Sequence, residues 1–132
     1  MAKKILVVDD DLSMTHMVET RLKAEGYEVI ALNFPKNAIK LIKNERPDLV
    51  LLDIIMPYMD GYKLCEEIKS SFGNKIPVII YTAKSYEKEL IAEAHKAFGA
   101  DDFLIKPFQP EELLAKIEKL IPKEDTPSSE GP

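Results

Sequence analysis

The sequence predicts an α/β fold in which helices cover both faces of a doubly wound, five-stranded parallel sheet. The first observation is an alternation of five short apolar runs with longer amphipathic stretches. The second is that the first, third and fourth runs are nearly continuous in Val, Ile and Leu, which is typical of strands buried on both faces. We therefore expect strands at residues 5–8, 28–32, 49–52, 78–81 and 103–105.

A helix is expected in each stretch that follows a strand, because apolar side chains recur there at helical spacing. Glycine or proline ends four of these stretches, at Gly26, Pro47, Gly99 and Pro122. Short connections between alternating strands and helices require right-handed crossovers, which arrange five βα units as a doubly wound sheet. The apolar stripes are Met14, Val18 and Leu22; Ala38, Leu41 and Ile42; Leu64, Ile68 and Phe72; Leu90, Ala94, Ala97 and Phe98; and Leu113, Ile117, Leu120 and Ile121.

Length and composition predict one globular domain. The chain has 132 residues, of which 45% are hydrophobic and 31% charged, a balance that excludes a mainly disordered protein. We expect the domain to occupy residues 1–121. In the remaining segment, 122–132, no apolar side chain that could dock follows Pro122, so we expect a flexible C-terminal tail and no output domain.

Charge and cysteine content restrict the partners and the compartment. A formal net charge of −5 gives no reason to expect direct binding to nucleic acid or to an anionic membrane, both of which need clustered Lys and Arg. The single cysteine, Cys65, cannot form an internal disulfide, and no targeting segment or membrane span is visible. The cytoplasm is therefore the expected location.

Three aspartates lie at the ends of two predicted strands: Asp9 and Asp10 after the first, and Asp53 after the third. Carboxylates gathered at one edge of a sheet repel one another unless a cation neutralises them, and an all-oxygen site suits Mg²⁺. We expect Asp10 and Asp53 to be direct magnesium ligands and Asp9 to act through a metal-bound water. The backbone carbonyl of Ile55 is expected to reach the ion, whereas Asp11 is interpreted as a helix N-cap.

Thr82 and Lys106 follow the fourth and fifth predicted strands and bring a hydroxyl and a cation to the same edge. Both can bind oxygens of a phosphoryl group on Asp53. In-line transfer to a carboxylate needs a metal and a cation to neutralise phosphoryl oxygens and little other covalent help. The pattern predicts phosphoryl acceptance by Asp53, although a single strand-end aspartate is more often a turn former, and Thr82 alone could equally be a turn residue.

Four motifs in order, VVDDD, LLDIIMPYMDGY, YTA and GADDFLIKPF, resemble the response-regulator receiver domain of two-component signalling. The resemblance covers roughly residues 3–121, and the chain is similar to the single-domain chemotaxis regulators. It implies a flavodoxin-like sheet with strand order 2-1-3-4-5, and a phosphoryl group received from a histidine kinase or a phosphotransfer protein. The implied roles are phosphoacceptor for Asp53, acidic pair for Asp9 and Asp10, switch hydroxyl for Thr82, pocket lysine for Lys106 and switch aromatic for Phe103.

The resemblance also implies a signalling receiver rather than an enzyme, one that assists its own phosphorylation and slow dephosphorylation. Neither Ile55 nor Lys84 offers a carboxylate or amide to orient an attacking water. Phosphorylation would draw Thr82 inward, and Phe103 would fill the vacated space, carrying the change to the face formed by the fourth helix, fifth strand and fifth helix. The sequence does not identify the effector. Two alternatives stay open: a magnesium-dependent phosphatase with Asp53 as nucleophile, and a phosphate-independent protein-binding module.

Overall fold

The computed structural model describes residues 2–56, 59–82, 98–106 and 108–122. Within them, five parallel strands form one sheet in the order β2-β1-β3-β6-β7, which is 2-1-3-4-5 for the five predicted strands and confirms the flavodoxin-like fold. Residues 83–97, which hold all of the predicted fourth helical stripe except Phe98, and residues 123–132 of the predicted tail lie outside the described residues. The strands are β1 (Lys4–Val8), β2 (Glu28–Leu32), β3 (Leu49–Asp53), β6 (Val78–Thr82) and β7 (Asp102–Ile105).

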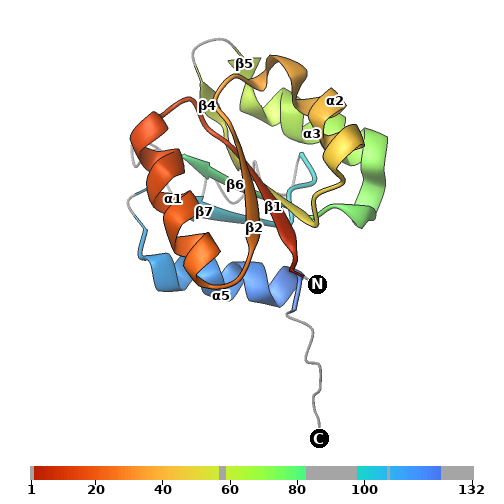
Figure 1. The fold of residues 1–132 in the computed structure, drawn as a ribbon. Helices are drawn as coiled ribbons and strands as arrows, with labels where there is room; N and C mark the ends of the chain where they lie inside the picture. The colour runs from red at the N-terminus through yellow and green to blue at the C-terminus, as the bar shows by residue number, and fades with distance from the viewer. Residues whose placement is uncertain (1, 57–58, 83–97, 107, 123–132) are drawn as a thin grey trace, which may run out of the picture.

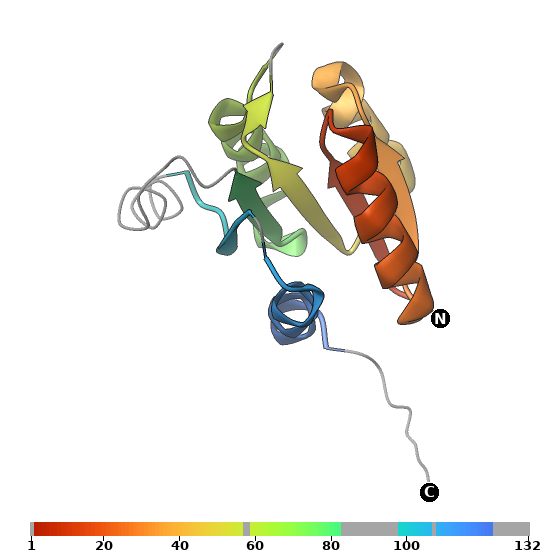
Figure 2. The same ribbon diagram turned by 90° about the vertical axis from the view of Figure 1, so that its left-hand side faces the viewer.

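Helices cover the sheet on both faces (Figures 1 and 2). The longest described helix has 13 residues, and none in this part of the chain is long and apolar enough to cross a bilayer. Helices α1 and α5 pack on one face of the sheet, and α2 and α3 pack on the other. Their bounds are α1 (Leu12–Ala24), α2 (Ala38–Glu45), α3 (Gly61–Phe72) and α5 (Pro110–Leu120), and short 3-10 turns lie at η1 (Pro35–Asn37) and η2 (Gly73–Lys75).

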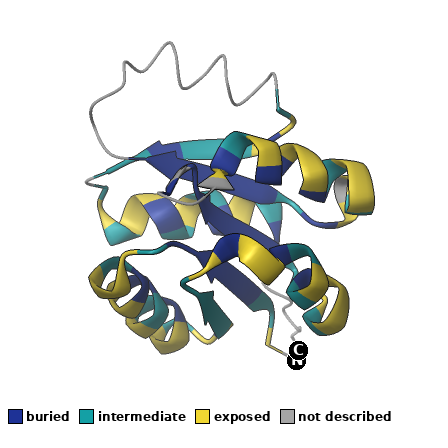
Figure 3. Cartoon of the chain, turned by 90° about the horizontal axis from the view of Figure 1, so that it is seen from above, coloured by how far each residue is buried: buried dark blue, intermediate teal, exposed yellow. Residues whose placement is uncertain are grey.

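The core has two layers because successive strand residues point to opposite faces of the sheet. Ile5 belongs to the buried cluster that contains Val18 of α1 and Ile117 of α5. Its neighbour Leu6 belongs instead to the cluster that contains Ile42 of α2. Both layers are apolar, as the continuous hydrophobic runs predicted. Seen from above, the buried strands lie between helices whose outer faces are exposed (Figure 3).

Local signals set the helix ends. Asp11 is the N-cap of α1, and its side chain accepts a hydrogen bond from the backbone N–H of Met14 at 3.1 Å, which confirms the N-cap prediction. The second helix stops one residue earlier than its proline signal suggests, because Arg46 adopts a left-handed conformation with φ of 49°. Pro110 starts α5, where its missing N–H has no helical partner to lose.

The segment after β3 differs from the prediction. Two short antiparallel strands, β4 (Ile55–Met56) and β5 (Met59–Asp60), form a second sheet that the sequence pattern did not predict. Each has two residues, too few to show an alternating pattern. Asp53 and Thr82 are themselves the last residues of β3 and β6, so the predicted strands were one residue short.

Candidate functional site

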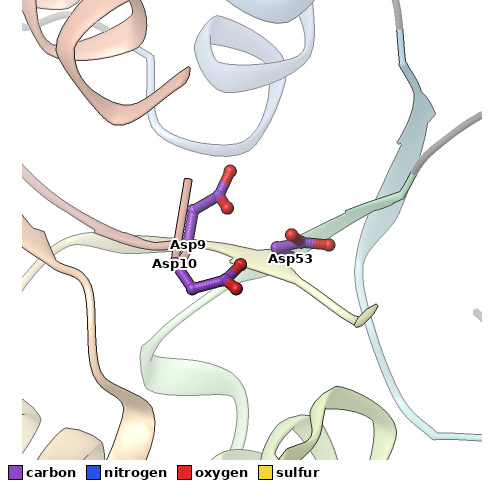
Figure 4. Close-up of side chains that lie close together, drawn as sticks. All are labelled: Asp9, Asp10 and Asp53. Atoms are coloured by element: carbon purple, nitrogen blue, oxygen red, sulfur yellow. The ribbon is translucent and has the colours of Figure 1, made fainter. Parts of the chain in front are cut away.

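The acidic cluster lies where β1 and β3 end side by side. Val8 is the register partner of Leu52, so Asp9 and Asp53 follow at neighbouring positions. Each of Asp9, Asp10 and Asp53 offers a carboxylate oxygen, and these oxygens lie within 4.8 Å of one another (Figure 4). Asp9 and Asp53 are buried, with exposed fractions of 0% and 4%, and Asp10 is the most accessible of the three. The structure therefore brings together the three predicted carboxylates.

Asp9 is held by donors on both of its carboxylate oxygens. Oδ1 accepts a hydrogen bond from the backbone N–H of Asp11 at 2.9 Å. Oδ2 accepts one from the Tyr81 hydroxyl at 2.5 Å and lies 3.3 Å from the Lys106 ammonium. The Asn33 amide donates to the Asp9 carbonyl oxygen at 2.8 Å, which fixes the backbone as well. Since its oxygens are already engaged, a role through a metal-bound water stays the prediction for Asp9.

Lys106 connects two of the carboxylates. Its ammonium lies 3.3 Å from Asp9 Oδ2 and 3.5 Å from Asp53 Oδ2. Its backbone N–H donates to the Thr82 carbonyl at 2.7 Å, which continues the ladder between β6 and β7 and aims the side chain at the cluster. The cluster sets three carboxylates against this one ammonium, so these four groups keep an excess of negative charge. A hard divalent cation bound by oxygen ligands fits this donor set.

The Thr82 side chain is buried with its hydroxyl at the same edge of the sheet. It is fully buried, and its Oγ1 has no hydrogen-bond partner among the residues that the structure describes. A buried hydroxyl without a partner destabilises a protein by about 1–3 kcal/mol, so such groups are retained mainly where a partner arrives during function. The structure thus places a buried hydroxyl without a partner among the described residues at the same edge of the sheet as the carboxylates.

Tyr81 is a site residue that sequence reasoning missed, because it closes an apolar run and looks like core. It is the register partner of Asp53, so both side chains point to the face covered by α1 and α5. Burial, followed by the negative charge of Asp9 and the hydrogen bond to it, raises the pKa of Tyr81 well above its usual value. The hydroxyl therefore stays protonated and donates. The available signal was strand alternation, which places Tyr81 on the face opposite to that of Thr82.

A close backbone contact fixes the chain immediately after Asp53. The N–H of Gly61 donates to the Ile54 carbonyl at 3.2 Å, and a Cβ added at Gly61 would lie 2.2 Å from the Ile54 Cα. Only glycine fits there without displacing backbone. Asp60 caps α3 by accepting from the N–H of Tyr62 at 2.9 Å. Ile55 lies in β4 within this support, and its carbonyl stays a predicted metal ligand.

Phe103 lies in β7, where it is half-buried. It pairs with Ile80 in the register while Thr82 pairs with Ile105, so Phe103 and Thr82 lie on the same face of adjacent strands. The Lys116 ammonium of α5 is 5.7 Å from the centre of the Phe103 ring, and it also pairs with Asp102 at 3.0 Å. The predicted partner surface on the fourth helix is outside the described residues.

Cys65 does not belong to the site. It is fully buried in α3, and its thiol lies 3.6 Å from the carbonyl oxygen of Phe98. Burial raises the pKa of the thiol to about 11. Because the thiolate is the reactive form, this cysteine acts as a small core side chain.

Comparisons with known proteins agree with this geometry. A family model, "Response regulator receiver domain", matches residues 5–118. Among solved structures, a putative response regulator from Chloroflexus aurantiacus is 31% identical with a TM-score of 0.82, covering 91% of this chain and 98% of that one. The chemotaxis protein CheY4 of Vibrio cholerae is 30% identical with a TM-score of 0.82, covering 92% of this chain and 100% of that one.

Curated relatives are longer than this chain. The probable transcriptional regulators ycf27 of Porphyridium aerugineum and Cyanophora paradoxa are 40% identical over 127 and 126 residues. Each alignment covers 96% of this chain and 51% of the relative. The chain therefore spans about half the length of the curated relatives that it matches.

Proposed function

The chain belongs to the response-regulator receiver domain family, and from that premise we propose that it is a phosphorylation-activated switch whose Asp53 accepts the phosphoryl group. The observation that carries the proposal is the composition of one edge of the sheet. Asp9, Asp10 and Asp53 gather there with Lys106, and the same edge holds a buried Thr82 hydroxyl that has no partner among the described residues. A carboxylate acceptor, a cation and a free donor are the groups that phosphoryl transfer requires.

Two buried carboxylates lie beside Lys106, and Asp53 is the acceptor in this proposal because it keeps an exposed fraction of 4%, whereas Asp9 has none and accepts hydrogen bonds on both of its oxygens. A carboxylate oxygen of Asp53 forms the new P–O bond as the P–N bond of a phosphohistidine in the donor breaks. Lys106, 3.5 Å from Asp53, then binds a phosphoryl oxygen, and the Thr82 hydroxyl donates to another. The donor is a sensor histidine kinase or a phosphotransfer protein.

Magnesium is the proposed cofactor. Asp10 and Asp53 would hold the ion directly, Asp9 through a water, and the Ile55 carbonyl would complete the protein ligands. When bound, Mg²⁺ neutralises phosphoryl oxygens during in-line transfer. The fit rests on the all-oxygen donor set and on the excess negative charge of the cluster.

The proposed output is a change in shape. A phosphoryl group adds negative charge and acceptor oxygens, which draw the Thr82 hydroxyl inward and open space for the Phe103 ring on the same face of the sheet. Inverting a 1:99 population needs about 5.5 kcal/mol, and two or three charge-assisted hydrogen bonds of about 1.5–3 kcal/mol each can supply it. The change would reach β7, α5 and the predicted fourth helix, where an effector protein binds.

We further propose that this receiver acts by protein contact in the cytoplasm, without turning over an external substrate and without binding nucleic acid or membrane directly. The net charge of −5 and the single cysteine support these points. Loss of the phosphoryl group is slow in this proposal. The single-domain boundary at residue 121 and the flexible tail after it stay predictions.

Incubation with Mg²⁺ and acetyl phosphate followed by mass spectrometry tests the proposal. We expect an adduct of about 80 Da on the parent chain, lost in Asp53→Ala and persisting long enough to be followed with time. The matched control is Asp48→Asn, which changes a carboxylate at the opposite end of the sheet and should keep the adduct.

Two results would contradict the proposal. An unmodified parent chain would favour the phosphate-independent binding module, and steady turnover of a phosphate monoester would favour the phosphatase. A separate experiment tests the role of Thr82. The Thr82→Ala variant should take up the phosphoryl group, but its phosphorylated and unphosphorylated forms should differ less by NMR than those of the parent.

A further inference from the structure

We propose that the Tyr81 hydroxyl is a positioning group that holds the Asp9 carboxylate in place when Lys106 leaves it for the phosphoryl group on Asp53. The inference rests on the proposed function of the site. It concerns the hydrogen bond from Tyr81, in the interior strand β6, to Asp9, across 72 positions of the sequence. In this role Tyr81 acts through Asp9 and touches neither the phosphoryl group nor the metal.

Hydrogen-bond donors of the protein stabilise the negative charge of the Asp9 carboxylate. The Asp9 side chain has no exposed surface, so bulk water does not compensate the negative charge, and apart from the proposed metal-bound water the compensation must come from protein groups. The structure supplies three: the Asp11 N–H at 2.9 Å, the Tyr81 hydroxyl at 2.5 Å and the Lys106 ammonium at 3.3 Å. These donors differ in how firmly they are held.

Lys106 is the one of these three donors that can leave. Its ammonium lies on a long flexible stem and is already shared with Asp53 at 3.5 Å. The Asp11 N–H belongs to the backbone at the start of α1. The Tyr81 ring is fully buried and packs edge-on against Phe108, with centroids 6.0 Å apart. A phosphoryl group on Asp53 would therefore attract Lys106 and leave Tyr81 where it is.

Removing the Tyr81 hydroxyl would make Asp9 depend on Lys106. In Tyr81→Phe, Lys106 would be the sole side chain among the described residues that donates to the Asp9 carboxylate. Moving Lys106 to a phosphoryl group would then strip a buried carboxylate of its last side-chain donor, which is unfavourable. The variant should bind a phosphoryl group more weakly, although its ring keeps the contacts with Phe108 and Lys106.

Beryllofluoride, a tetrahedral phosphoryl analogue, is the probe for this effect. With saturating Mg²⁺, we expect Tyr81→Phe to bind beryllofluoride about tenfold more weakly than the parent, the effect of losing one hydrogen bond to a charged group. Magnesium affinity measured without the analogue should change much less, because Lys106 then keeps its place on Asp9. A loss of packing alone would not separate the two affinities.

The matched control is Tyr27→Phe. Tyr27 is a buried tyrosine in the same core cluster but precedes β2 and so lies at the opposite end of the sheet. Its substitution removes a hydroxyl from a buried ring and should leave beryllofluoride affinity unchanged. A double-mutant cycle adds specificity: in an Asp9→Asn background, Tyr81→Phe should lose most of its effect.

The outcomes separate this inference from the proposed function. A parent chain that fails to bind beryllofluoride overturns the proposed function and the inference with it. A parent that binds, together with a Tyr81→Phe variant of equal affinity or one that loses magnesium equally, overturns the inference alone. Should Tyr81→Phe not fold, the ¹³Cζ shift of Tyr81 in the parent decides: a hydrogen-bonded shift that persists with beryllofluoride supports the inference, and a change to the unbonded value overturns it.

Discussion

The two ends of the sheet use charged side chains in opposite ways. At the amino end, the carboxylates of Asp48 and Asp101 accept hydrogen bonds from nearby protein donors. Asp48 accepts from the backbone N–H of Lys4 at 2.7 Å, and Asp101 accepts from that of Val78 at 2.8 Å and from the Lys69 ammonium at 2.9 Å. The bonds to Lys4 and Val78 each tie a loop to the first residue of a strand, and the bond from Lys69 ties the Asp101 loop to α3. These pairs stabilise the fold and leave little for a ligand to gain.

The carboxyl end holds more acceptors than donors. Asp9, Asp10 and Asp53 lie close together there, Lys106 pairs with Asp9 and Asp53, and Thr82 keeps a buried hydroxyl without a partner in the described part of the chain. A fold selected for stability alone would remove such a mismatch, since violations of local rules concentrate where a protein functions. The polar groups are thus paired at the amino end of the sheet and only partly paired at the carboxyl end, which is where we propose that magnesium and the phosphoryl group bind.

Removing Asp101 should have the largest effect on stability. Asp101→Ala takes away both the acceptor of the buried Val78 N–H and the partner of Lys69, so we expect a loss of about 2–3 kcal/mol in the free energy of unfolding. Urea denaturation measures it, with the exposed Glu66→Ala on α3 as a control near zero. Beryllofluoride binding should be unchanged. A loss under about 0.5 kcal/mol would show that the amino end is not held by these bonds.

Neutralising a carboxylate at the other end should have the opposite sign. Asp10→Asn relieves repulsion in the cluster, so without Mg²⁺ we expect a gain of about 1 kcal/mol in the free energy of unfolding. Magnesium at about 100 times its dissociation constant should stabilise the parent by about 2.7 kcal/mol, and the variant by less. Thermal unfolding with chelator and with Mg²⁺ measures both.

Asp48→Asn is the control for that experiment. It alters a satisfied carboxylate at the amino end, so it should lower stability by about 1 kcal/mol whether or not Mg²⁺ is present. If Asp10→Asn also destabilised the chain without metal, repulsion among the three carboxylates would not be what limits stability at the carboxyl end.

The smallest difference is expected at alkaline pH, between variants of the two buried tyrosines, Tyr81 and Tyr27, which lie at opposite ends of the sheet. Burial raises the pKa of Tyr81 well above 10, with Asp9 adding to it, and burial raises the pKa of Tyr27 as well. The folded state then keeps protons that the unfolded state loses, so stability is intact below about pH 10 and falls above it. Each tyrosine contributes at most about 1.4 kcal/mol per pH unit.

Tyr81→Phe should therefore flatten the alkaline decline of stability more than Tyr27→Phe does. Denaturant titrations between about pH 9 and pH 11, on either side of the usual tyrosine pKa, measure the slopes. Equal slopes for the two variants would mean that the Asp9 hydrogen bond adds nothing to the environment of Tyr81.

Most of the fold followed from periodicity. Hydrophobic spacing located the five strands to within a residue and four helices by their stripes, and chain order placed Asp9, Asp53, Thr82 and Lys106 at one edge. The pairing of β4 with β5 was not predicted, because strands of two residues are too short to show an alternating pattern. The role of Tyr81 in the site was not predicted, because a tyrosine at the end of an apolar run looks the same in sequence whether its hydroxyl contacts solvent or a carboxylate.

By itself, the sequence determined which residues are apolar, which elements they form and which polar groups end the strands, since these depend on neighbours along the chain. The tertiary structure alone decided that the Tyr81 hydroxyl meets Asp9, that Lys106 stands between two carboxylates and that the Thr82 hydroxyl is buried without a partner among the described residues. The physical reason is the short range of the interactions involved. Hydrogen bonds and desolvation act over a few ångströms between atoms that only the packing of separate strands brings together.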